Sequence, residues 1–104
     1  MADAVELLRS LASEKRLRML CLITERERSV GELCAELALA QANVSQQLAV
    51  LRRAGLVLGR REGQTIYYSL ASEAVRRVLE ALCNVYGRPQ PSPGPQRRRR
   101  TFPD

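Results

Sequence analysis

The apolar residues of this chain recur mostly at the spacing of short helices, and one region alternates as strands do. Two β-prone runs, separated by Glu62 and Gly63, indicate a hairpin between helical segments. The expected helices cover about residues 3–12, 14–25, 29–37, 41–54 and 73–86, and the expected strands cover residues 56–61 and 64–70. The pattern predicts a mainly α protein with a small β-hairpin.

Two of these helices meet at a tight turn, and the first begins with a capping signal. Ser29 is followed three residues later by Glu32, which is the pairing of a capping box. Apolar side chains then form one stripe of this helix: Val30, Leu33, Cys34 and Leu37. Residues 38–40, Ala-Leu-Ala, form the turn, so the pair is predicted to be a helix-turn-helix.

The second helix of the pair has an apolar face and an uncharged polar face. Val44, Leu48 and Leu51 fall on one side at helical spacing, and residues 41–49 contain no charged side chain. Amide and hydroxyl groups suit the base edges in the major groove of DNA. The residues expected to face DNA are Gln41, Ala42, Asn43, Ser45 and Gln46. The alternative is a neutral amphipathic helix of any small bundle.

The hairpin follows this second helix directly. Gly55 is a typical C-terminal cap, and the β-prone runs come after it. Arg60, Arg61 and Gln64 lie near the tip of the hairpin, where arginines meet phosphates or the adjacent minor groove. A helix-turn-helix followed at once by a basic hairpin predicts a winged helix.

The remaining helices differ in how much apolar surface they carry. Residues 14–25, capped by Ser13, are apolar nearly all round, so this helix is expected to be buried. Its first turns carry Lys15, Arg16 and Arg18, which are interpreted as a solvated surface rather than phosphate contacts. Ser72 caps the last helix, and no further element remains to cover its apolar stripe. That stripe consists of Val75, Val78, Leu79, Leu82 and Tyr86.

Length and composition divide the chain into a domain and a tail. A chain of 104 residues with 45% hydrophobic content supports one modest core, expected in residues 1–87. Residues 88–104 read RPQPSPGPQRRRRTFPD, and their frequent prolines predict a disordered tail. The net charge is +6; five arginines against one aspartate place +4 of it in the tail, which leaves +2 for the domain. The tail is interpreted either as a DNA-tethering arm or as a solubilising segment.

Residues 13–23 and 32–70 resemble the ArsR/SmtB family of bacterial winged-helix repressors; they read SEKRLRMLCLI and ELCAELALAQANVSQQLAVLRRAGLVLGRREGQTIYYSL. The resemblance covers about residues 5–87 and is most specific in the second helix of the pair, its exit and the wing. Ala40 departs from the family, which often has a capping Ser there. By the usual value of a cap, this costs the helix about 1 kcal/mol.

The resemblance implies a repressor that binds a palindromic DNA operator as a homodimer, with the first and last helices forming the dimer interface. The expected interface residues are Val5, Leu8, Val78, Leu79, Leu82 and Tyr86. Two alternatives stay open. One is a repressor of this family with no thiol or metal sensing in this chain, and the other is a winged helix used for protein or RNA contacts.

Metal sensing, which is common in the family, lacks its usual residues here. The chain contains no histidine, so the zinc site that the family builds from Asp and His has no counterpart. The arsenic-type site uses two thiols two residues apart; Cys34 matches the first, but Glu36 stands at the second. Cys34 is therefore expected to be a packing residue, and no metal or other cofactor is expected.

Cys21 carries a different resemblance. Residues 17–21 are similar to those of the thiol-based (HlyU/BigR/SqrR-like) members of the family, which sense oxidants or reactive sulfur. Those members pair this cysteine with another near the end of the last helix. The matching position here is Gly87, and the nearest thiol is Cys83, one turn earlier. Cys21 and Cys83 are thus candidates for a redox pair, and core packing is the alternative for both.

Other classes of protein are disfavoured. An enzyme is not expected, because a nucleophile would lack a histidine base and no Gly-rich phosphate loop is present. The N-terminus does not resemble a signal peptide, and no run is long enough to span a membrane. Three cysteines without close pairs do not form a secreted disulfide framework. A cytoplasmic protein with no membrane partner is expected.

Overall fold

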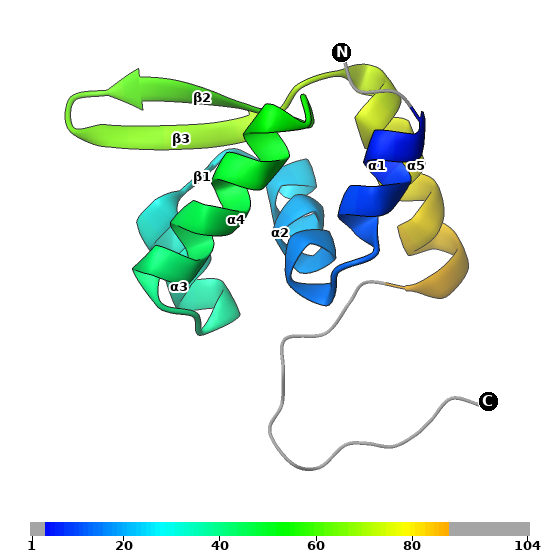
Figure 1. Ribbon diagram of the computed structural model, residues 1–104, viewed down its shortest axis with the longest axis horizontal. Coiled ribbons are helices and arrows are strands. Elements are labelled where there is room, and N and C mark those ends of the chain that lie inside the picture. The colour runs from blue at the N-terminus through cyan, green and yellow to red at the C-terminus, as the bar shows by residue number, and fades with distance from the viewer. Residues whose placement is uncertain (1–3, 88–104) are drawn as a thin grey trace, which may run out of the picture.

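Every helix that the sequence predicts is present in the computed structural model, which describes residues 4–87 (Figure 1). The elements are, in chain order, α1 (Ala4–Leu11), α2 (Glu14–Glu25), β1 (Arg28–Ser29), α3 (Val30–Leu37), α4 (Gln41–Arg53), β2 (Val57–Glu62), β3 (Thr65–Leu70) and α5 (Glu73–Tyr86). The expected mainly α fold with a winged helix-turn-helix is confirmed. The predicted tail, residues 88–104, lies outside the described residues.

The sheet has one strand more than the predicted hairpin. Its three strands are antiparallel in the order β1-β3-β2, and Arg28 of β1 pairs with Tyr68 of β3. The hairpin register runs from Val57 opposite Leu70 to Glu62 opposite Thr65. Two residues carry too short a pattern to predict a strand, and β1 exists because β3 offers it a free edge.

The helix ends follow the local signals in the sequence. The Ser29 hydroxyl accepts a hydrogen bond from the Glu32 backbone N–H at 3.1 Å, and the Glu32 carboxylate accepts one from the Ser29 backbone N–H at 2.9 Å. Ala38 adopts the left-handed conformation (φ 57°) that ends α3 and turns the chain toward α4. Ala40 precedes α4 without a side-chain cap, as the sequence predicts. These ends place α3 and α4 beneath the sheet (Figure 1).

The core is centred on α2. Met19, Leu20 and Ile23 are at most 1% exposed, and they pack with buried residues of the helix-turn-helix, the sheet and α5. The expectation of a solvated basic turn is wrong for Arg18, which is only 7% exposed, because α2 is enclosed on most sides. Lys15 is exposed, as expected. No helix in the described part of the chain has the length and apolar character needed to cross a membrane.

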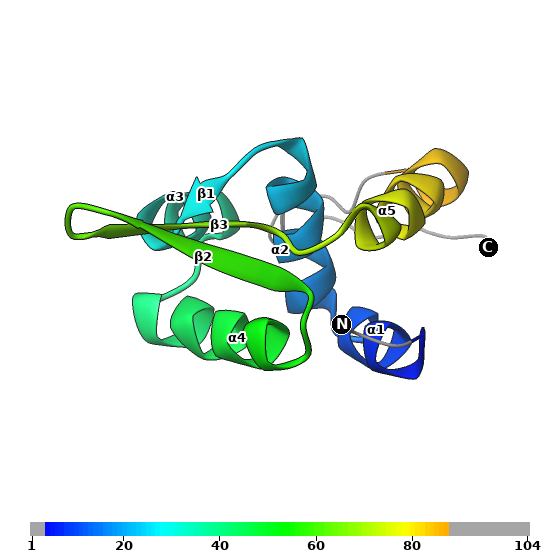
Figure 2. The same ribbon diagram turned by 90° about the horizontal axis from the view of Figure 1, so that it is seen from above.

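Helices α1 and α5 lie at the end of the molecule opposite the hairpin (Figures 1 and 2). Several of their apolar side chains are exposed. The exposed ones are Val5, Leu8, Val78, Val85 and Tyr86. Leu82 is half-buried. The expectation that Leu79 belongs to an outer surface is wrong, because it is fully buried in the core of its own chain. Val85, which the sequence pattern did not single out, is 72% exposed.

Candidate nucleic-acid interface

The exposed face of α4 carries most of the residues that the sequence predicts to read DNA. Gln41, Ala42, Ser45 and Gln46 are exposed, and Asn43 is half-buried. On the opposite side of the helix, the apolar row of Val44, Leu48 and Leu51 is at most 1% exposed. Burial of this row fixes the rotation of α4 about its axis, so the amide and hydroxyl groups face solvent.

A hollow of about 340 Å³ separates the end of this face from the sheet. Its lining consists of Ser45, Ala49, Arg52, Arg53 and Tyr68. Both arginines are exposed in the last turn of α4, whereas Tyr68 of β3 is only 8% exposed. The sequence analysis did not select these two arginines as DNA contacts, although they stand in the family-like exit from the helix and are the first charged residues after the uncharged stretch of α4.

Arg16 connects α4 to the rest of the domain. Its Nη1 donates to Oε1 of Gln47 in α4 at 3.1 Å, and its Nε donates to the backbone oxygen of Ser10 in α1 at 3.0 Å. The expectation that Arg16 is merely solvated is therefore wrong, because the side chain is half-buried between three helices. The contact couples the position of α4 to α1 and α2.

The wing presents its two arginines on opposite faces. Arg61 stands opposite Ile66 and Arg60 opposite Tyr67, and successive residues of a strand point to opposite sides. Arg61 therefore shares the face of Tyr68, which lines the hollow beside α4. Gln64, in the turn of the hairpin, is exposed, as Arg61 is. Arg61 and Gln64 are the two wing residues, of the three expected to contact DNA, whose exposed side chains form no hydrogen bond or ion pair within the described part of the chain.

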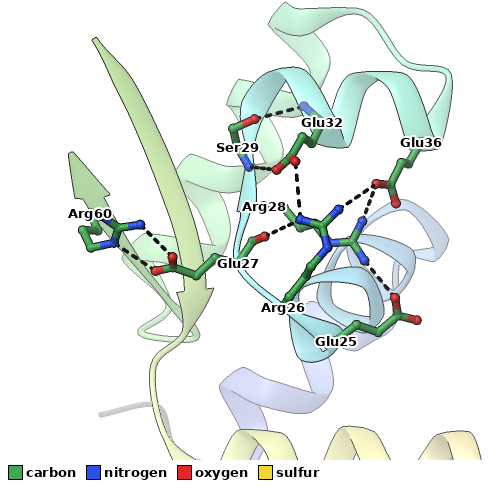
Figure 3. A network of polar contacts seen from close by, with 8 residues as sticks. All are labelled: Glu25, Arg26, Glu27, Arg28, Ser29, Glu32, Glu36 and Arg60. Atoms are coloured by element: carbon green, nitrogen blue, oxygen red, sulfur yellow. Dashed lines mark hydrogen bonds and ion pairs between the residues drawn. The ribbon is translucent and has the colours of Figure 1, made fainter. Parts of the chain in front are cut away.

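Arg60 is bound within the chain instead. Its Nη2 and Nε donate to the two carboxylate oxygens of Glu27 at 2.8 and 3.2 Å (Figure 3). Its Nη1 lies 3.5 Å from Oε1 of Glu62, and its guanidinium carbon lies 5.1 Å from the centre of the Tyr67 ring. The hydrogen bonds from Arg60 lower the pKa of Glu27 below its ordinary value of 4.5, and the Glu27 carboxylate raises the pKa of Arg60.

Further charged groups hold the segment that carries Glu27. The buried Arg28 donates from Nη2 to Oε1 of Glu25 at 2.8 Å and from Nη1 to Glu36 of α3. Arg26 lies 3.4 Å from the Glu32 carboxylate, which also belongs to the capping box (Figure 3). These contacts join the end of α2, β1 and both ends of α3. Glu27 thus projects toward β2 from an anchored stretch of backbone.

None of the three cysteines lies on α4. The Sγ atoms of Cys21 in α2 and Cys83 in α5 are 3.8 Å apart, and none of the three cysteines is in a disulfide. Cys21 is 4% exposed and Cys83 is half-buried. Cys34 packs against the core from α3, as expected. Within residues 4–87, no three or more His, Cys, Asp or Glu side chains gather closely enough to hold a metal ion.

Comparison with known proteins gives concordant matches. Residues 13–58 match the family described as bacterial regulatory protein, arsR family. The chain is 48% identical over 85 residues to the transcriptional activator HlyU of Vibrio cholerae, covering 82% of this chain and 79% of that protein. It is 45% identical over 84 residues to a biofilm growth-associated repressor of Agrobacterium fabrum, covering 81% and 72%.

Solved structures agree with these matches. The structure of Vibrio cholerae HlyU superposes with a TM-score of 0.78, covering 80% of this chain and 90% of that one. The homodimeric winged helix-turn-helix DNA-binding domain Mb0332 of Mycobacterium bovis is 32% identical, with a TM-score of 0.73 and coverage of 78% and 75%. The similarity therefore spans nearly the whole described part of the chain.

Proposed function

Because the chain belongs to the ArsR family of bacterial regulatory proteins, we propose that it represses transcription by binding a palindromic DNA operator as a homodimer. Its relatives include a transcriptional activator and a repressor. The observation that carries the proposal is the uncharged, exposed face of α4, which ends beside an arginine-lined hollow. Such a regulator acts on the chromosome, so the proposed location is the cytoplasm, and no catalytic activity is proposed.

The proposed contacts divide into those that read bases and those that bind phosphates. Gln41, Asn43, Ser45 and Gln46 offer the amide and hydroxyl groups that recognise base edges in the major groove, and Ala42 offers a methyl group for apolar contact. Phosphates are bound beside them by side chains of the helix end and the wing. These are Arg52, Arg53, Arg61 and Gln64.

A homodimer is proposed to present two copies of α4 to the same side of the duplex. The exposed apolar side chains of α1 and α5 provide the interface, in agreement with the homodimeric state of the similar Mycobacterium bovis domain. Two recognition helices related by a two-fold axis meet successive major grooves about 34 to 36 Å apart. The operator is therefore expected to be an imperfect palindrome with half-sites one helical turn apart.

The test of this function compares specific with random DNA. Binding of the full chain to the promoter region of its own gene and to a random duplex of equal length is measured at about 0.15 M salt. A sequence-specific regulator binds its operator at least about a thousand-fold more tightly than random duplex. Equal affinity for the two duplexes would contradict the proposal, and preferential binding to RNA or to a protein would favour the other use of a winged helix.

Release from DNA is proposed to follow oxidation of Cys21 and Cys83. Their Sγ atoms are in van der Waals contact, so a modest approach of α5 to α2 allows an S–S bond. With peroxide, the two thiols lose two protons and two electrons, which reduce one peroxide to two waters. With a hydrogen polysulfide, a zero-valent sulfur atom is inserted between the two Sγ atoms. The terminal sulfurs of the polysulfide take up the two electrons and two protons that the thiols lose, and they leave as hydrogen sulfide. The link shifts α5 relative to α2. We propose that the resulting movement of α2 reaches α4 through the hydrogen bond between Arg16 and Gln47.

A further inference from the structure

We infer that Glu27 competes with DNA phosphates for Arg60 and so limits the sequence-independent affinity of the wing. The inference rests on the proposed DNA-binding function and assigns a role to a residue outside the expected interface. A carboxylate that accepts two hydrogen bonds from one guanidinium occupies the same donor groups that a phosphate would use. In this structure Arg60 is therefore not available to DNA.

The geometry turns Arg60 away from the expected DNA contacts of α4. Arg60 and Tyr67 face each other in the register, on the side of the sheet opposite Arg61. The guanidinium of Arg60 lies over the Tyr67 ring of β3. Its nitrogen atoms bind Glu27, which precedes β1 (Figure 3). The neighbouring Arg28 is bound to Glu25 of α2 and to Glu36 of α3, so the backbone that carries Glu27 is tied to both helices.

The pair is exposed enough to open. The side chains of Arg60 and Glu27 are 51% and 39% exposed, so water and salt screen their attraction. A phosphate carried by a duplex brings a higher local charge than one carboxylate and can displace it. Displacement costs the two hydrogen bonds to Glu27, and this cost is subtracted from the free energy that the phosphate contact contributes. The carboxylate thus limits the affinity of the wing for DNA by occupying Arg60.

Charge in this region supports the same conclusion. The positive charges of Arg60 and Arg61 are balanced by the negative charges of Glu27 and Glu62. The wing together with Glu27 therefore carries no net charge. Removal of the Glu27 charge gives this region one net positive charge. The guanidinium of Arg60 then keeps only its weak contact with the Glu62 carboxylate, at 3.5 Å. A plot of the logarithm of the binding constant against the logarithm of the salt concentration becomes steeper by about 0.9 for each added phosphate contact.

The experiment measures binding of full-length wild type, Glu27→Gln and Glu80→Gln to a random duplex and to the promoter of the gene, across a range of salt concentrations. Glu80 is exposed on α5, so its variant removes the same charge without releasing an arginine of the wing. Arg60→Gln and the double variant Glu27→Gln/Arg60→Gln complete the cycle. Thermal unfolding of each variant checks that the fold is retained.

The expected result is that Glu27→Gln binds both duplexes up to about ten-fold more tightly per wing at 0.1 M salt. The salt dependence of its binding constant should also be steeper, by about 0.9 per wing in the logarithmic slope. Glu80→Gln changes affinity less, Arg60→Gln alone has little effect, and the double variant loses the gain. Unchanged binding by Glu27→Gln overturns the inference, because Glu27 then does not limit the affinity. Weaker binding also overturns it, because Glu27 then supports the wing in its DNA-binding position. Wild-type protein that binds no duplex contradicts the DNA-binding function itself, and with it this inference.

Discussion

The Sγ atoms of Cys21 and Cys83 lie 3.8 Å apart although 62 positions separate the two residues in the sequence. The contact joins α2, the centre of the core, to α5, which carries exposed apolar side chains. The resemblance to thiol-based members of the family implies a second cysteine at the position of Gly87. Cys83, one turn earlier, takes up the contact with α2 instead.

We expect peroxide or polysulfide to link Cys21 to Cys83 and to weaken DNA binding, because the link pulls two packed helices into a new arrangement. Mass spectrometry of the treated protein identifies the linked peptides, and DNA binding is followed in parallel. Cys21→Ser should retain DNA under the same treatment, whereas Cys34→Ser, a control for the third thiol, should release it as wild type does. If no link forms and Cys21→Ser releases DNA normally, both thiols are packing residues.

Substitutions in α4 and in the wing should have different effects on DNA binding. Gln46→Ala removes an exposed amide of the reading face and should lower the preference for the operator over mismatched sites by about 1 to 3 kcal/mol. Arg61→Ala should weaken binding to all duplexes alike and lower the salt slope by about 0.9 per wing, since phosphates are the same in every sequence. Binding isotherms on operator, mutated operator and random duplex distinguish the two outcomes. A uniform loss in Gln46→Ala would remove it from the reading face.

A charge among the exposed apolar residues of α1 should dissociate the dimer. Leu8 is 64% exposed in the single chain, so Leu8→Glu leaves the core intact but places a carboxylate in the proposed interface. An unpaired carboxylate in a dry interface costs several kcal/mol. Sedimentation velocity at micromolar concentration should show a monomer, while Leu58→Glu, at an exposed leucine of β2, stays dimeric. A folded Leu8→Glu protein that remains dimeric would place the interface elsewhere.

Ala40→Ser should stabilise the domain by about 0.5 to 2 kcal/mol, because α4 begins without a side-chain cap. The backbone at Ala40 already has the extended conformation of an N-cap residue (φ −67°, ψ 151°), so the hydroxyl can accept a backbone N–H of the first turn without rearrangement. Urea unfolding measures the gain. Ala42→Ser, inside the first turn of α4, is the matched control and should give no stabilisation; equal effects of the two variants would show that capping is not the cause.

Local signals in the sequence determined the helices, their ends and the wing. The capping box of Ser29 and Glu32 involves residues three positions apart, and the buried row of Val44, Leu48 and Leu51 repeats within three turns of one helix. Interactions over so few residues are encoded in the residue pattern itself. For the same reason the missing cap at Ala40 follows from the residue type at that position alone.

Tertiary structure alone decided the contacts between distant segments. The partner of Arg60 is Glu27, 33 positions earlier, and Arg16 binds Gln47, 31 positions later. No periodicity reports such pairs, because they depend on how β1 joins the sheet and how α4 sits against α2. Leu79 shows the same limit, since its place in the stripe of α5 suited either an interface or the core. Only the angle at which α5 packs on α2 and β3 determined that the side chain points inward.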